Sequence, residues 1–168
     1  PEARAFVGVL AGSIALIATY LTAQGAYPDF LQALRHTAFH VVSVATTTGY
    51  ATYDYAQWPL FAPMWIILLG CFATCAGSTG GGIKMVRLLL LIKQAQREMV
   101  RIVHPNVVNP VVLGGRSVSD RVMQGVTAYM MAYGATLVGM TLLMLFSGLD
   151  IVTAFTAVIA CVNNIGPG

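Results

Sequence analysis

The residue types best suited to chemistry lie in one short stretch, Thr46-Thr47-Thr48-Gly49-Tyr50. Carbonyl and hydroxyl oxygens can replace the water around a dehydrating cation, as the TVGYG loops of potassium channels do. Gly49 can take a positive φ at little cost, so the carbonyls on either side of it can point into one pore. The stretch therefore predicts a cation selectivity filter, with the residues from Thr46 to Gly49 as its backbone ligands.

A second stretch near the end of the sequence repeats the first. Thr37-Ala38-Phe39 precedes the threonine run, and Thr153-Ala154-Phe155 precedes a run that reaches its glycine one residue later. Each copy follows an Asp that can cap a short helix, and each follows a segment of membrane length. An internal repeat of span, re-entrant helix and filter loop indicates a pseudo-symmetric pore. The second set of predicted filter residues is Asn163, Asn164, Ile165 and Gly166.

The composition favours a membrane protein that is built from helices. Of the 168 residues, 57% are hydrophobic and 9% are charged, and soluble domains carry nearer a quarter of charged residues. We expect an all-α fold with a first pore repeat at 1–104, a basic cytoplasmic loop at 105–121 and a partial second repeat at 122–168. Within these repeats we expect spans at 5–24, 58–103 (broken) and 122–146, pore helices at 29–45 and 150–162, and filters at 46–50 and 163–168.

The two predicted pore helices are too short or too polar to cross a bilayer. The 29–45 segment carries Gln32, Arg35, His36 and His40, and a span needs about 20 mostly apolar residues. A re-entrant helix fits this length, and the negative end of its dipole would face the filter and favour a cation. A metal site at the histidines is disfavoured, because no Cys or carboxylate stands at ligand spacing.

A glycine-rich run, Gly77-Ser78-Thr79-Gly80-Gly81-Gly82, interrupts the next apolar segment and is followed by Ile83 and Lys84. A straight helix over 60–103 would be about 65 Å long, far more than a hydrocarbon core of about 30 Å. Non-helical backbone at membrane depth must line a water-filled cavity, so we expect a mobile gate here, with Lys84 as an electrostatic barrier. A passive hinge is the alternative. A nucleotide-binding P-loop is rejected, because Ile83 separates the glycine from the lysine and Met85 replaces the hydroxyl residue.

Most of the positive charge falls in one interval between apolar segments. A nucleic-acid surface is a weak explanation, because the flanking segments are of membrane length and the positive-inside rule accounts for the cluster. With this interval and Arg4 inside, the first span runs outward and both filter loops enter from outside. The cluster consists of Lys84, Arg87, Lys93, Arg97, Arg101, Arg116 and Arg121.

Three motifs taken in order, ATTTGY, CAGSTGGGIK and VNNIGPG, resemble the membrane subunit of the bacterial Trk potassium uptake system (the TrkH/TrkG type), within the Trk/Ktr/HKT superfamily. The resemblance covers essentially the whole chain and implies a fragment with the third pore repeat and part of the fourth. It also implies a glycine-rich gating loop below the filter, a homodimer in the bacterial inner membrane and a cytosolic nucleotide-binding TrkA-like subunit, for which residues 84–121 are the candidate docking surface.

Two departures from the potassium-channel filter lead us to expect a looser selectivity. Ala51 follows Tyr50 and Pro167 follows Gly166 where TVGYG has a second glycine, and asparagines replace two threonines in the second copy. Two other classes of protein stay open. A secondary transporter could bind its substrate at broken helices, although both copies here run in the same orientation. A membrane enzyme could use the glycine run for a nucleotide, although no general base, nucleophile or metal cluster supports it.

Overall fold

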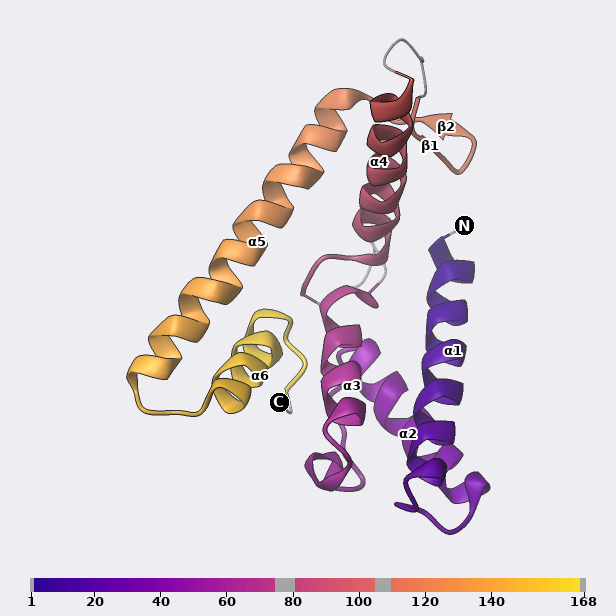
Figure 1. Ribbon diagram of the computed structural model, residues 1–168, viewed down its shortest axis with the longest axis vertical. Coiled ribbons are helices and arrows are strands. Elements are labelled where there is room, and N and C mark those ends of the chain that lie inside the picture. The colour runs from indigo at the N-terminus through magenta and orange to yellow at the C-terminus, as the bar shows by residue number, and fades with distance from the viewer. Residues whose placement is uncertain (1, 75–80, 105–109, 167–168) are drawn as a thin grey trace.

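The computed structural model describes residues 2–74, 81–104 and 110–166. Helices account for almost all of the regular structure (Figure 1). The elements in chain order are α1 (Glu2–Ala23), α2 (Phe30–Ala45), the 3-10 helix η1 (Tyr55–Gln57), α3 (Phe61–Phe72), α4 (Met85–Val103), β1 (Val112–Leu113), β2 (Arg116–Ser117), α5 (Asp120–Phe146) and α6 (Ile151–Val162).

The helices form two groups along the long axis of the molecule. In Figure 1, α1 runs along one side, α2 turns back from its end, and α3 packs beside both. The helices α4 and α5 meet at the upper end and diverge below it, and α6 lies between the lower part of α5 and α3. Both short helices α2 and α6 therefore start near the lower end and stop halfway along the molecule, as re-entrant helices would.

One apolar core ties both groups together. It combines Ile17 of α1, Val44 of α2, Ile66 of α3 and Ile159 of α6, which are all buried, together with Ile165 just beyond α6. Burial of apolar surface is non-directional, so the polar contacts fix how the helices meet. The Trp65 indole N–H donates to the Ser13 hydroxyl at 3.1 Å and thereby links α3 to α1.

In the part of the chain that the structure describes, two helices are long and apolar enough to cross a membrane, Glu2–Ala23 and Asp120–Phe146. The predicted span over 58–103 is divided into α3 and α4, and α3 has only 12 residues, about 18 Å at 1.5 Å per residue. The helix α3 ends at Phe72 and α4 begins at Met85. The predicted glycine-rich run lies between them in the sequence. Within it, Gly77, Ser78, Thr79 and Gly80 lie outside the described residues.

The predicted basic loop contains a small element that the sequence analysis did not anticipate. The strands β1 and β2 pair antiparallel, with Val112 opposite Ser117 and Leu113 opposite Arg116. The intervening Gly114 and Gly115 both have positive φ, 60° and 82°, as a two-residue hairpin turn requires. Apart from this hairpin, the regular structure of the described residues is thus helical. The helix α5 begins at Asp120, two residues before the predicted start of the last span.

Each of the two predicted pore helices, α2 and α6, follows an aspartate. The Asp29 carboxylate accepts from the Leu31 amide at 3.2 Å, and the Asp150 carboxylate accepts from the Thr153 amide at 3.0 Å. Both are helix N-caps, and the negative charge also complements the dipole. Hydrogen bonds from Thr153 hold the pKa of the exposed Asp150 carboxyl below its ordinary value.

Replacing Asp150 with asparagine is expected to remove the acid sensitivity of this cap without removing the cap. The folded-state pKa is the lower one, so the stabilisation by Asp150 is present above the unfolded pKa and lost as pH falls through the folded pKa. Asparagine also caps helices but does not titrate in this range. Thermal unfolding between neutral and acidic pH measures the effect. An equal acid response of wild type and Asp150→Asn would contradict it.

Candidate functional site

The helices α2 and α6 each end in a turn, and the two turns are of the same type. After α2, the Thr47 amide donates to the Val44 carbonyl at 3.0 Å and the Thr48 amide donates to the Ser43 carbonyl at 2.9 Å. Thr47 itself has left-handed backbone. These two bonds around a left-handed residue form the Schellman motif, which terminates many helices. It satisfies carbonyls of the last helical turn and turns the chain back across the helix end.

The second copy reproduces these bonds residue for residue. The Asn164 amide donates to the Cys161 carbonyl at 3.2 Å, and the Ile165 amide donates to the Ala160 carbonyl at 2.9 Å. Asn164 has φ 56°, against 55° for Thr47 of the first copy. The four predicted filter residues of one copy therefore correspond in order to the four of the other.

Thr47 is an unusual residue at the left-handed position of this turn. Asn tolerates left-handed backbone, but a β-branched residue with φ near 55° is an outlier that costs about 1–3 kcal/mol. Such strain persists only where the surroundings impose it, and it is concentrated at functional sites. The strain at Thr47 marks this turn as a candidate site by a criterion independent of sequence motifs.

The two filter glycines lie next to each other. Gly49 has φ 75° and Gly166 has φ 97°, and a Cβ placed on Gly166 would lie 3.8 Å from the Gly49 Cα. Within the described part of the chain, no donor reaches the carbonyls of Thr46, Thr47 or Thr48. The same is true for the carbonyls of the last three residues in the second copy, Asn164, Ile165 and Gly166.

The first copy is held from behind by two side chains of α2. The Ser43 hydroxyl donates to the Tyr50 carbonyl at 2.7 Å. The ring nitrogens of His40, which is fully buried, lie 2.8 Å from the His36 carbonyl and 3.1 Å from the Tyr53 carbonyl. The sequence analysis considered His40 only as a disfavoured metal ligand and did not identify Ser43. A polar residue on the buried face of the pore helix was the available signal.

Asn163 differs from its counterpart Thr46. Thr46 is exposed, whereas Asn163 is fully buried and its carbonyl accepts from the Gly81 amide at 3.2 Å. Its side-chain oxygen accepts from the Tyr133 hydroxyl at 3.0 Å, and its side-chain nitrogen donates to the Ile159 carbonyl at 2.8 Å. The predicted filter residue is thus engaged on every side by protein atoms.

Of the predicted gate residues, the structure describes Gly81, Gly82 and Lys84. Both glycines lie directly against Asn163, and Gly82 has φ 82°. Lys84 has φ 67° and immediately precedes α4. The last two glycines of the run thus lie against the second predicted filter stretch, just before the chain continues into the basic helix.

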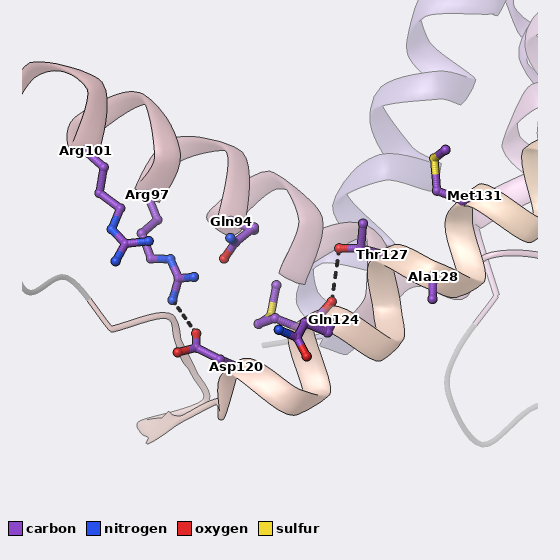
Figure 2. Close-up of a pocket in the computed structure, with 9 residues that line it drawn as sticks. Gln94, Arg97, Arg101, Asp120, Gln124, Thr127, Ala128 and Met131 are labelled. Atoms are coloured by element: carbon purple, nitrogen blue, oxygen red, sulfur yellow. Dashed lines mark hydrogen bonds and ion pairs between the residues drawn. The ribbon is translucent and has the colours of Figure 1, made fainter. Parts of the chain in front are cut away.

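A cavity of about 580 Å3 lies between the basic helix α4 and the start of α5 (Figure 2). Arg97 reaches across it and pairs with Asp120 at 2.9 Å. On the same helix, Lys93 donates to the Val112 carbonyl at 2.7 Å, and the Arg87 guanidinium lies 3.9 Å from the centre of the Tyr129 ring. Much of the predicted basic surface is thus used within the chain, and Arg101, which pairs with Glu98 at 3.5 Å, keeps a half-exposed side chain.

Among the described residues, no group of three or more His, Cys, Asp or Glu side chains is placed to hold a metal ion. The oxygens that the two candidate stretches offer are the backbone carbonyls that no donor reaches within the described residues. Such oxygens are the ligands that suit a weakly held alkali cation, because binding must be weak enough for release.

Comparison with known proteins gives consistent relatives. A family model described as TrkH, cation transport protein, matches residues 26–168. The Trk system potassium uptake protein TrkH of Salmonella typhimurium is 40% identical over 168 residues, which is 100% of this chain and 35% of that protein. The TrkG protein of Escherichia coli (strain K12) is 36% identical over 167 residues, 99% of this chain and 34% of that protein.

A solved structure is also similar. The potassium transporter TrkH from Vibrio parahaemolyticus matches with a TM-score of 0.93 and 38% sequence identity, over 100% of this chain and 36% of that chain. The likeness confirms the predicted helical membrane fold. The chain spans about a third of the length of these relatives.

Proposed function

This chain belongs to the TrkH family of cation transport proteins, and from that premise we propose that it supplies two of the filter stretches of a pore that conducts potassium. The family description also excludes the membrane-enzyme alternative. One observation carries the proposal: two helices end in turns of the same type and their glycines meet, with carbonyls on both sides that no donor from the described residues reaches.

The proposed ligands are backbone carbonyls that replace the hydration shell of the ion. In the first copy they belong to Thr46, Thr47, Thr48 and Gly49. In the second copy they belong to Asn164, Ile165 and Gly166. Asn163 was predicted as a ligand from the sequence, but its carbonyl accepts from the Gly81 amide, so we propose for it a supporting role. Two further stretches, from the rest of a four-repeat protein, would complete the ring.

The glycine-rich run 77–82, with Lys84, is the proposed gate. The contacts of Gly81 and Gly82 with Asn163 support this assignment, because they put the run beside a filter stretch. A loop there obstructs the path while it stays in place and opens the path when it moves. The backbone groups of such a loop need partners at membrane depth. For Gly81 and Gly82, which the structure describes, the hydrogen bonds with Thr74, Tyr129 and Asn163 supply such partners.

We further propose that the protein lies in the bacterial inner membrane, forms a homodimer and binds a cytosolic nucleotide-binding subunit of the TrkA type. The docking surface for that subunit is the end of α4 with the β1–β2 hairpin, which lie together in Figure 1. Lys93 and Arg97 are bonded to other parts of the chain, whereas Arg101 pairs only with Glu98 on its own helix, at 3.5 Å, and its side chain stays half exposed. Arg101 is therefore the described basic residue of α4 that we propose for the contact with this partner.

The experiment that tests the pore is an electrical one. We expect the full-length protein in a planar bilayer to carry a current that reverses at the potassium equilibrium potential and varies linearly with small voltages. A secondary transporter would instead show saturating uptake that depends on a second ion gradient, with a displaced reversal potential. Replacing potassium with sodium on one side measures the selectivity, which we expect to be moderate because the second filter glycine of potassium channels is absent.

A further inference from the structure

Residues 81–85 comprise the last two glycines of the glycine-rich run and the three residues that follow them. This segment is anchored to the end of α3. The Ile83 amide donates to the Cys71 carbonyl and the Met85 amide donates to the Thr74 carbonyl, both at 2.8 Å. The Thr74 hydroxyl also donates to the carbonyl of the first residue in this segment at 3.3 Å. These bonds join the segment to α3, but they do not connect it to the filter.

Two tyrosines of α5 connect the 81–85 segment to the filter. The Tyr129 hydroxyl donates to the Gly82 carbonyl at 2.8 Å. One helical turn further on, the Tyr133 hydroxyl donates to the side-chain oxygen of Asn163 at 3.0 Å. The Asn163 carbonyl in turn accepts from the Gly81 amide at 3.2 Å. The rings of the two tyrosines are stacked, with centroids 6.3 Å apart. One hydroxyl thus binds the 81–85 segment, and the other binds the filter residue on which that segment rests.

The fit at this contact leaves no free space. A Cβ on Gly81 would lie 2.7 Å from the Val162 carbonyl oxygen and 2.8 Å from the Asn163 Cα. A Cβ on Gly82 would overlap the side-chain oxygen of Asn163. The orientation of that side chain is therefore part of the surface against which the segment rests, and the Tyr133 hydroxyl helps to fix this orientation.

We propose that Tyr129 and Tyr133 are positioning residues that lock the 81–85 segment against the second filter stretch. This inference rests on the proposed pore function. To move away from the filter, the segment must break the bonds from Tyr129 to Gly82 and from Gly81 to Asn163. The helix α5 therefore sets how readily the gate opens, although neither tyrosine touches the ion.

The Arg87 guanidinium stacks on the Tyr129 ring, so the first turn of α4 is connected to the same lock. Withdrawal of Arg87 by a movement of α4 would leave the Tyr129 ring without one of its neighbours. The lock thus lies between the basic helix and the filter, where a displacement of α4 can weaken it.

The test removes one hydroxyl at a time from the full-length protein. Tyr129→Phe and Tyr133→Phe keep the rings and delete one hydrogen bond each, and Tyr20→Phe is the matched control. Tyr20 packs edge-to-face on Phe61, and its hydroxyl has no hydrogen bond within the described residues. We expect the ratio of open to closed time to rise about 2- to 10-fold in each lock variant, with selectivity unchanged, because a net hydrogen bond has that order of effect. The control should behave as the wild type.

Hydrogen exchange of the amides in the 81–85 segment gives a second readout that does not need conduction. Exchange there should be faster in both lock variants and unchanged in Tyr20→Phe. A full-length protein without potassium current but with faster exchange would refute the pore and leave the lock standing. Normal gating together with unchanged exchange in both variants would refute the lock. A change in selectivity instead of gating would also refute it, since the tyrosines would then serve the filter itself.

Discussion

Gly49→Ser is expected to reduce the preference of the pore for potassium over sodium by about tenfold or more. Gly49 has φ 75°, and left-handed backbone costs an L-residue about 1–2 kcal/mol. The serine can avoid this cost only by rotating the peptide, which turns a ligand carbonyl away from the ion. The loss of one ligand worth about 1.4 kcal/mol in discrimination is a factor of ten. The reversal potential under potassium and sodium gradients measures the preference.

The chain offers a matched control for this substitution. Gly25, in the turn between α1 and α2, has φ 71°, and a Cβ there would meet nothing within 4 Å. Gly25→Ser therefore carries the same backbone strain without a role in ion binding, and its selectivity should be that of the wild type. If Gly49→Ser and Gly25→Ser had the same selectivity, the 46–50 stretch would be an ordinary turn and the pore proposal would fail.

Gly82→Ala is expected to raise the ratio of open to closed time by about tenfold or more. A Cβ at this position would lie 2.5 Å from the Cys71 carbonyl oxygen and would overlap the Asn163 side chain. Overpacking of a filled site costs about 1–3 kcal/mol, and the φ of 82° adds to it. The segment cannot keep its position against the filter, so the open state is favoured. Single-channel recording with expression checked in parallel measures this effect.

Gly148→Ala separates steric from backbone effects. Gly148, between α5 and α6, has a similar φ of 87°, but a Cβ there would meet nothing within 4 Å. Both alanines share the same conformational strain, and only the one at position 82 meets neighbours. Gating that is unchanged in Gly82→Ala would remove this glycine from the gate.

Local rules predicted the helix ends well. Aspartate caps at 29 and 150 and the turn residues after each pore helix act within a few positions along the chain, so their patterns are readable. The register of the repeat was less clear, because the Thr-Ala-Phe triplets align one residue away from the glycines. The structure decides between the two alignments. The hydrogen bonds at the ends of α2 and α6 match when the glycines are aligned, and the Thr-Ala-Phe triplets are then one position out of register.

The role of Asn163 could not be read from the sequence. Its partners are Gly81 and Tyr133, which are 82 and 30 residues away, and only the packing of α3, α5 and α6 brings them together. The shortness of α3 was missed for a related reason. The apolar run continues to Ala76, so hydropathy alone gave no sign that the helix ends at Phe72. Hydrogen bonds to the carbonyls of Cys71 and Thr74 take the place of further helical turns.

The two pore helices differ in length, with 16 residues in α2 and 12 in α6, although they end in the same turn. Measured back from the filter along its own axis, α2 extends about 6 Å further than α6. The outer rim of the pore would then be taller on one side than on the other. A rigid blocker with fourfold symmetry, of the kind that seats evenly on a tetrameric channel, would rest on the taller side and leave a gap above α6.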